Sequence, residues 1–201
     1  AQGRHALAAE RLRTMRERSP RGEYSTHASL TEAQCRHAMG EHADALTLYQ
    51  AAFANGTDAV RPYALLGIGQ LERVAGRLGE AARALDELAS AFADLPIVDS
   101  AILERGRVHM DAREHERALA VFSTLVPPSS KRPPEPVHHE AAYRMAQCEL
   151  QIGRFEDAAT HLVALLARMK SGPLVPGAMF DLAWALQGAG KGDDASRAFS
   201  Q

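Results

Sequence analysis

Small and large apolar side chains recur along the chain at fixed distances from a series of turn positions. The turn positions are Gly3, Gly40, Gly76, Arg113, Gly153 and Gly190, and successive ones are 37, 36, 37, 40 and 37 residues apart. An alanine stands five residues after each of them and a large apolar residue four residues later. The alanines are Ala8, Ala45, Ala81, Ala118, Ala158 and Ala195, and the large residues are Leu12, Tyr49, Leu85, Phe122, Leu162 and Phe199. A further apolar residue follows three positions on, such as Met15 or Leu88. Spacings of four and seven place these side chains on one face of a helix, so each turn position is predicted to be followed by a helix.

The stretch before each turn position repeats as regularly. The chain has alanine twelve residues before the turn and glycine or alanine seven residues before it. These residues are Ala28, Ala64, Ala101, Ala141 and Ala178, followed by Ala33, Gly69, Gly106, Ala146 and Ala183. Small side chains let two helices approach closely, and glycine permits the positive φ that ends a helix. Each repeat is therefore predicted to be an antiparallel pair of helices, and successive pairs must stack to bury their apolar faces.

The residues at these positions resemble the tetratricopeptide repeat family. The resemblance rests on Ile68-Gly69 with Gly76, Ala81 and Leu85, and on Leu182-Ala183 with Gly190, Ala195 and Phe199. The column that the family fills with leucine holds Glu32 and Arg105 in two units. The tyrosine column holds Arg36, Glu72, His109, Glu149 and Leu186, so that contact must be made differently, and the closing proline survives clearly only at Pro20.

The resemblance implies an all-α fold, a right-handed α-solenoid of antiparallel helix pairs with about five and a half repeats in one domain, residues 1–201. The expected units are 1–24 (second helix only), 25–60, 61–97, 98–137, 138–174 and 175–201, the last helix being truncated. A proline-rich loop between repeats, residues 127–137, explains the step of 40 residues.

Composition and charge narrow the function classes. A formal net charge of −2 argues against a nucleic-acid binder, and no apolar run reaches the roughly 18 residues of a membrane span. Cys35 and Cys148 share one column of the repeat and are interpreted as packing residues. The sequence shows no catalytic constellation, so we expect no enzyme, no cofactor and no metal site.

In the family that this chain resembles, the first helices line a concave groove. The groove residues expected from that register are Gln34, His37, Gln70, Arg73, Arg107, Tyr143, Gln147, Phe180, Trp184 and Gln187. Glutamine suits hydrogen bonding to a peptide backbone and arginine suits a carboxylate, although a solvated groove also needs polar residues. Trp184, the only tryptophan, is either a binding anchor or core for a following helix. The lysine and asparagine of the family's carboxylate clamp are absent from these positions.

The expected function is a non-enzymatic scaffold or adaptor that binds a partner peptide or helix, with assembly of a bacterial envelope complex as one setting. The alternative is a regulatory or ligand-sensing domain of a larger enzyme or transcription regulator, and a third hypothesis is self-association through ends that carry no capping face. Residues 1–21 hold six arginines and two glutamates, which indicates either phosphate or anionic-lipid binding or a solvated helix face. The ratio of 20 arginines to 3 lysines suggests a bacterial protein, in the cytoplasm, the periplasm or associated with the outer membrane.

Overall fold

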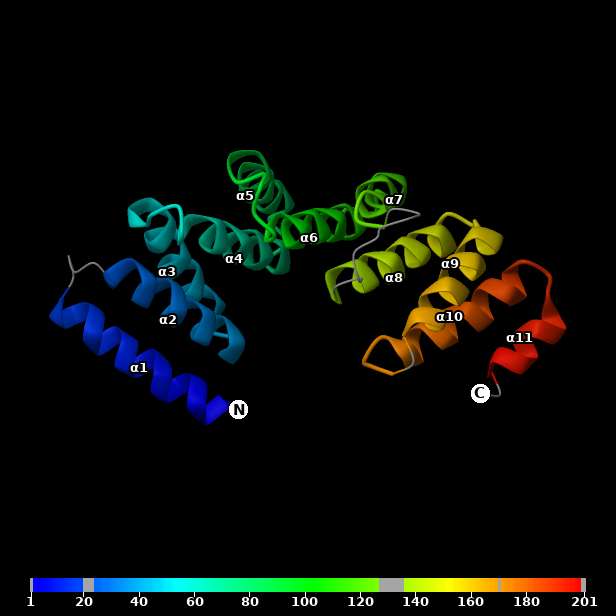
Figure 1. Cartoon of the computed structure of the whole chain (residues 1–201), viewed down its shortest axis with the longest axis horizontal. Coiled ribbons are helices and arrows are strands. Elements are labelled where there is room, and N and C mark those ends of the chain that lie inside the picture. Colours follow the sequence, from blue (N-terminus) through cyan, green and yellow to red (C-terminus); the bar gives the residue numbers. More distant parts are fainter. Residues whose placement is uncertain (1, 20–23, 127–135, 170, 200–201) are drawn as a thin grey trace. The chain divides into compact units, whose positions relative to one another are not determined.

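The computed structural model describes residues 2–19, 24–126, 136–169 and 171–199, and in these residues it contains eleven helices and no strand (Figure 1). The all-α prediction is therefore confirmed. The chain divides into two compact units, residues 1–104 and residues 105–201. Pro20, most of the proline-rich segment (residues 127–135) and the side chain of Phe199 lie outside what is described.

Unit 1 contains the helices α1 (Gln2–Arg18), α2 (Ser25–Met39), α3 (His42–Asn55), α4 (Arg61–Val74), α5 (Leu78–Ala91) and the first half of α6 (Val98–Asp111). Each helix from α1 to α4 packs on the next one along the chain. Close packing depends on the small residues of the first helices. A Cβ atom at Gly67 would overlap the ring of Tyr49, and one at Gly69 would lie 2.6 Å from Leu85 Cδ2. The α3 and α5 side chains thus rest directly on the α4 backbone.

Unit 2 repeats this arrangement with the second half of α6. Its further helices are α7 (His115–Ser123), α8 (Pro136–Gln151), α9 (Phe155–Arg168), α10 (Val175–Gly188) and α11 (Gly192–Phe199). Phe122 of α7 is fully buried and lies so close to Gly106 of α6 that a Cβ atom there would overlap its ring. Ala146, Ala158 and Leu162, all 0% exposed, form the core between α8 and α9.

The alanine column forms the core of both units, with one exception in α1. Ala45, Ala81, Ala118 and Ala158 are 0% exposed and Ala195 is 4% exposed. In α1 the buried alanine is Ala9, Met15 is 44% exposed, and Gly3 lies inside the first turn of the helix. Gly3 therefore differs from the other turn positions, and Met15 differs from its counterpart Leu88, which is 0% exposed. The spacing reports which side chains share a face, but burial of that face depends on what packs against it, and α1 packs on α2.

The five other turn positions share one backbone geometry. Their φ values are +82° at Gly40, +76° at Gly76, +62° at Arg113, +78° at Gly153 and +75° at Gly190. In each turn the next residue donates its N–H to the carbonyl oxygen five residues earlier, which is the hydrogen bond of a Schellman motif. The bonds are Glu41 to Arg36, Arg77 to Glu72, Glu114 to His109, Arg154 to Glu149 and Lys191 to Leu186. This geometry holds the two side chains of each pair next to each other.

Candidate functional site

Side chains four residues before and one residue after a turn position form pairs across the turn. The first member of each pair stands in the column where the family has tyrosine. Arg36 Nη1 lies 2.8 Å from Glu41 Oε2, and His109 Nδ1 lies 2.7 Å from Glu114 Oε2. Glu72 forms an ion pair with Arg77, with the charges reversed. In these three turns a polar pair therefore stands at the position where the family has its tyrosine. The signal in the sequence was the opposite charge at a spacing of five residues.

The charged residue in the leucine column of the first complete repeat is satisfied in the same way. Glu32 is 1% exposed and accepts hydrogen bonds from Arg16 of α1, at 3.1 Å, and from Arg36, at 3.1 Å. A buried carboxylate with two guanidinium partners avoids the cost of an unpaired charge. Glu32 consequently joins α1 to α2.

Both cysteines are buried. Burial, with the carboxylate of Glu32 adding to it, raises the pKa of Cys35. Burial raises the pKa of Cys148 to about 11. Thiols held in the protonated form in an apolar environment are poor nucleophiles and metal ligands, in keeping with their interpretation as packing residues.

The expected groove residues of unit 1 divide into paired and exposed ones. Gln70 Nε2 donates to Glu104 Oε1 at 3.2 Å, and Arg73 Nε lies 3.1 Å from Glu104 Oε2. His37 makes edge contacts with His42 and Tyr49, at 5.8 Å and 6.2 Å between ring centroids. Burial and the neighbouring His42 lower the pKa of His37, which favours the neutral imidazole. Gln34 is exposed.

In unit 2 the same register produces a second set of bonds. Gln147 Nε2 donates to Asp181 Oδ2 at 3.1 Å, so α8 is bonded to α10. Burial and a hydrogen bond to the same carboxylate raise the pKa of Tyr143 to about 12. Arg107 Nη2 lies 2.5 Å from Glu140 Oε1. Burial opposes ionisation of Glu140, but Arg107 and Arg144 outweigh it and lower the pKa of Glu140.

Three acidic residues that sequence reasoning missed therefore organise the expected site. They are Glu104, Glu140 and Asp181, and they stand 31 to 34 residues after their glutamine or arginine donors. That separation is close to the length of one repeat. The signal in the sequence was therefore an acidic residue about one repeat after a polar groove residue. The structure uses Gln70, Arg73, Arg107 and Gln147 to join successive first helices.

The expected groove residues on α10 are exposed to solvent. Phe180 is 61% exposed and Trp184 is 53% exposed, and Gln187 is also exposed. The residues in the column of Phe180 are mostly buried, with Leu30 at 8%, Leu103 at 7% and Tyr143 at 8%. Two large aromatic side chains on one face of one helix are an exposed apolar surface of the kind that marks interaction sites.

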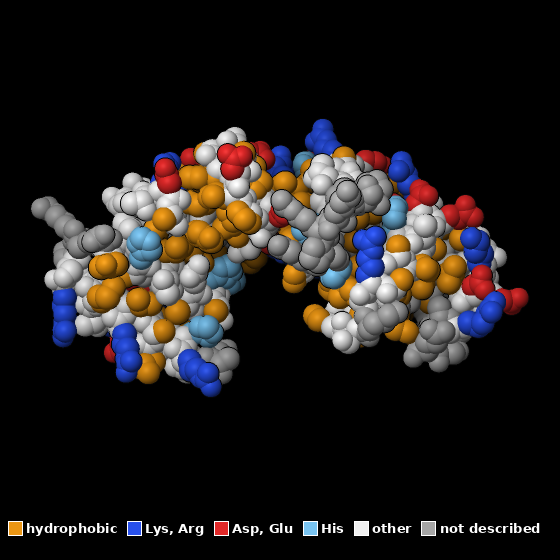
Figure 2. All heavy atoms as spheres, in the orientation of Figure 1, with side chains coloured by type: hydrophobic (Ala, Val, Ile, Leu, Met, Phe, Trp, Pro, Cys, Tyr) orange, Lys and Arg blue, Asp and Glu red, His pale blue; other side chains and the backbone are white. Residues whose placement is uncertain are grey.

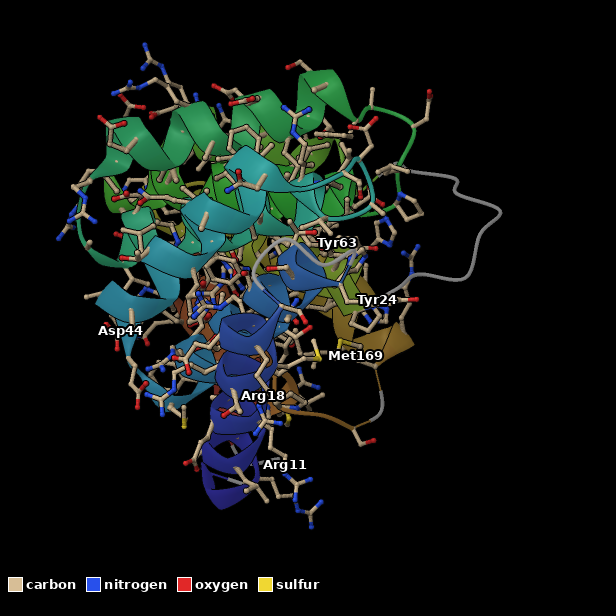
Figure 3. The ribbon with its side chains drawn as sticks, turned by 90° about the vertical axis from the view of Figure 1, so that its left-hand side faces the viewer. Arg11, Arg18, Tyr24, Asp44, Tyr63 and Met169 are labelled. Carbon is tan, nitrogen blue, oxygen red and sulfur yellow. The ribbon has the colours of Figure 1, made fainter. Side chains whose placement is uncertain are left out.

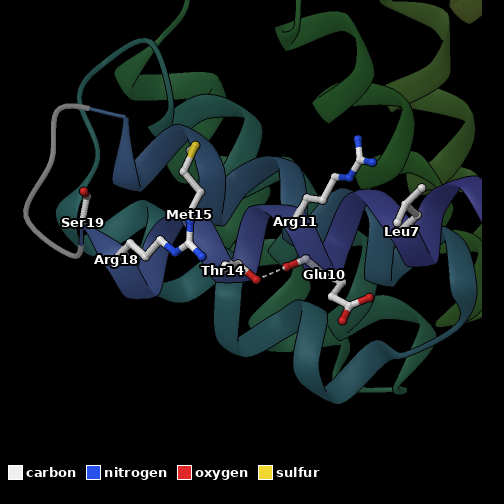
Figure 4. Close-up of a pocket in the computed structure, with 7 residues that line it drawn as sticks. All are labelled: Leu7, Glu10, Arg11, Thr14, Met15, Arg18 and Ser19. Atoms are coloured by element: carbon white, nitrogen blue, oxygen red, sulfur yellow. Dashed lines mark hydrogen bonds between the residues drawn. The ribbon is translucent and has the colours of Figure 1, made fainter.

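A basic surface lies on α1. One face of the helix forms an open pocket of about 580 Å³ (Figure 4), which is lined by Leu7, Glu10, Arg11, Thr14, Met15, Arg18 and Ser19. Thr14 Oγ1 donates to the carbonyl oxygen of Glu10 at 3.0 Å. Arg11 and Arg18 project from the same side of α1 (Figure 3). The surface combines exposed apolar side chains with positive charge.

Hydrophobic side chains also gather over α4 and α5 of unit 1 (Figure 2). In this unit Tyr63 is 48% exposed and Leu95 is 40% exposed. The guanidinium carbon of Arg61 lies 5.0 Å from the ring centroid of Phe53 and 5.9 Å from that of Phe92. These contacts join the end of α3, the start of α4 and the end of α5.

Across the described ranges, no helix combines the length and the hydropathy that crossing a bilayer requires. In the same residues, no three His, Cys, Asp or Glu side chains are grouped so that they could hold a metal ion.

Comparisons with known proteins agree with the observed architecture. The model of the tetratricopeptide repeat matches residues 30–96, 66–133 and 103–176. No curated protein matches the chain. Among solved structures, a tetratricopeptide repeat protein from Parabacteroides merdae superposes with a TM-score of 0.74 at 16% identity, over 98% of this chain and 72% of that one. YrrB, described as a tetratricopeptide repeat protein with an unusual peptide-binding site, has a TM-score of 0.66 at 16% identity, over 96% and 90% of the two chains. BtubC from P. vanneervenii has a TM-score of 0.71 at 15% identity, over 99% and 89%.

Proposed function

Since the chain belongs to the tetratricopeptide repeat family, whose stacked helix pairs are protein-interaction scaffolds, we propose that it is a non-catalytic scaffold that binds a partner protein. The partner peptide or helix binds to the first-helix surfaces. In unit 2 this surface is formed by the exposed Phe180, Trp184 and Gln187 of α10, together with Gln147 and the largely buried Tyr143 of α8. Arg107 of α6 also contributes to the surface in this unit. In unit 1 it is formed by Gln34, His37, Gln70 and Arg73.

The observation that carries the proposal is the exposure of Phe180 and Trp184 on one face of α10. The two residues are four positions apart, so their rings lie on the same side of the helix. Tryptophan in the centre of an interface contributes more binding energy than most residues, because it buries a large apolar area with few degrees of freedom. We therefore assign the main anchor to α10 and an orienting role to the polar residues.

The test is a selection of peptides from a random display library on the immobilised chain. The affinities of the selected peptides are then measured for the wild type and for Trp184→Ala, Phe180→Ala and two controls. Tyr63→Ala and Val163→Ala serve as controls, because these side chains are 48% and 54% exposed but lie on α4 and α9. We expect the α10 substitutions to weaken binding roughly thirtyfold or more, as at other interface hot spots, and the controls to leave it unchanged. Equal affinity for all variants would contradict the proposal.

A further inference from the structure

The sequence contains a single asparagine, Asn55, and the residue that follows it is Gly56. Asn55 is the last residue of α3 and is exposed to solvent. Asparagine is one of the thermolabile residues, because the backbone nitrogen of the next residue can attack its side-chain carbonyl carbon. Glycine at the next position favours this attack, since it is conformationally permissive and has no side chain to shield the nitrogen.

The packing of unit 1 explains why glycine follows Asn55. A Cβ atom at Gly56 would lie 2.3 Å from the carbonyl oxygen of Ala52 and 2.9 Å from Val60 Cγ1. Ala52 and Val60 are both 0% exposed and belong to the core of unit 1. A side chain at this position would therefore push the end of α3 away from the start of α4. The tight joint between the two helices thus keeps a reactive Asn–Gly pair in the chain.

The side-chain amide of Asn55 contributes to the end of α3. Its Nδ2 donates to the carbonyl oxygen of Ala51 at 3.0 Å, which ties the side chain to the last turn of the helix. A carboxylate in its place cannot donate this hydrogen bond, and it adds a negative charge at the negative end of the helix dipole. The last turn of α3 is described in full and holds no basic residue that would offset this charge. Conversion of the amide to a carboxylate therefore destabilises this helix end.

We propose that Asn55 is a site of spontaneous deamidation, and that the isoaspartate formed there loosens the joint between α3 and α4. The Gly56 nitrogen gives its proton to water and forms a bond to Asn55 Cγ, while Nδ2 takes up a proton and leaves as ammonia. Water then opens the resulting cyclic imide. Opening at Cγ gives aspartate. Opening at the backbone carbonyl carbon of Asn55 gives isoaspartate, in which the chain continues through the side chain and the former backbone carbonyl is a free carboxylate. Water is the only co-reactant.

Isoaspartate adds one methylene group to the backbone at a point where the core leaves no room. The N–H groups of Val60 and Arg61 both donate to the Thr57 carbonyl oxygen, at 2.8 Å and 2.9 Å, where α4 begins. A longer backbone between Asn55 and Gly56 displaces this turn and weakens both hydrogen bonds. Because α3 and α4 belong to successive repeats, aged molecules differ from new ones in the stiffness of one joint between repeats.

The first experiment measures the reaction in the folded chain. The full chain and a capped peptide with the sequence of residues 51–60 are incubated in mildly alkaline buffer, and mass spectrometry with fragmentation follows residue 55. We expect the folded chain to react roughly tenfold more slowly than the peptide, because the hydrogen bond of Asn55 and the last turn of α3 have to open first. A rate in the folded chain more than about a hundredfold below that of the peptide, or no conversion, would overturn the proposal.

Two controls identify the reacting amide. Gln50 is exposed on the same helix and should remain unmodified, because attack on a glutamine side chain forms a larger and less favourable ring. The variant Asn55→Gln keeps an amide at the site and should remain unmodified for the same reason. Conversion of this variant at the rate of the wild type would place the reaction elsewhere and overturn the assignment to Asn55.

The second experiment measures the effect on the joint. The isoaspartate form is purified by chromatography and compared with Asn55→Asp, which carries the same charge without the added methylene group. Amide hydrogen exchange is measured at Val60 and Arg61, with Ala158 of unit 2 as the internal control. We expect exchange at Val60 and Arg61 to be roughly tenfold faster in the isoaspartate form and unchanged at Ala158. Equal exchange in the two forms, or an equal increase at Ala158, would overturn the loosening of this joint.

Discussion

Glu104 is the acceptor on which the contact between α4 and α6 depends. It is 3% exposed and receives hydrogen bonds from Gln70 and Arg73. The substitution Glu104→Gln keeps the shape of the side chain but removes its charge. It also places an NH2 group next to the N–H donors of Gln70 and Arg73. Hydrogen bonds to charged groups contribute about 1.5–3 kcal/mol, and the 21% exposure of the Arg73 side chain moves its share toward the lower end. We expect the free energy of unfolding to fall by about 2 kcal/mol.

The assay is chemical denaturation followed by circular dichroism, in a double-mutant cycle of Glu104→Gln with Arg73→Met. Because methionine retains most of the apolar stem of arginine, the cycle isolates the charged hydrogen bond. We expect a coupling energy of about 1–1.5 kcal/mol. A control cycle of Arg73→Met with Glu116→Gln, an exposed residue of α7, should show additive effects. A coupling energy below about 0.5 kcal/mol for the Glu104 cycle would refute the assignment of Arg73 to a contact between repeats.

Further predictions concern backbone strain and titration. Arg113→Gly should raise the free energy of unfolding by about 1 kcal/mol, because the φ of +62° at Arg113 strains a residue that has a side chain, and Gly76→Ala should lower it by about as much. Denaturation midpoints equal to that of the wild type would contradict this backbone strain. In an NMR titration, the His37 imidazole should have its midpoint below 6.5, so that the stability given by the neutral ring is present above pH 6.5 and is lost as the pH falls through the lowered pKa; a midpoint at or above 6.5 would disprove this. With a pKa raised to about 11, Cys148 should react with a thiol reagent at pH 8 about 100-fold more slowly in the folded than in the unfolded chain, and comparable rates would show that the site is open.

The helices could be predicted because their determinants are local. Gly69 and Gly106 are small where Leu85 and Phe122 rest on the backbone, and that requirement recurs at each repeat. Gly3 fits the same spacing, yet it lies within α1, since a spacing alone does not reveal whether a chain turns or continues as helix.

The candidate site could be predicted only in part. The register identified Gln70 and Gln147 as polar residues of the first-helix face, but it did not identify their acceptors, because Glu104 and Asp181 belong to the next repeat. Which acid meets which donor depends on the stacking of successive pairs. The exposure of Trp184 likewise depends on which helices pack against α10, and neither the periodicity nor the composition of the chain predicts that packing.

The turn pairs and the bonds between first helices have different consequences for how such an array can change in evolution. Arg36 and Glu41 belong to the same repeat, so a duplicated or transplanted repeat brings its own compensating charge with it, whichever sign comes first. The bond from Gln70 to Glu104 joins two repeats, so it survives only if the order of these repeats is kept. A change in the order of the repeats would therefore break the carboxylate contacts between first helices and leave the pairs within each turn intact.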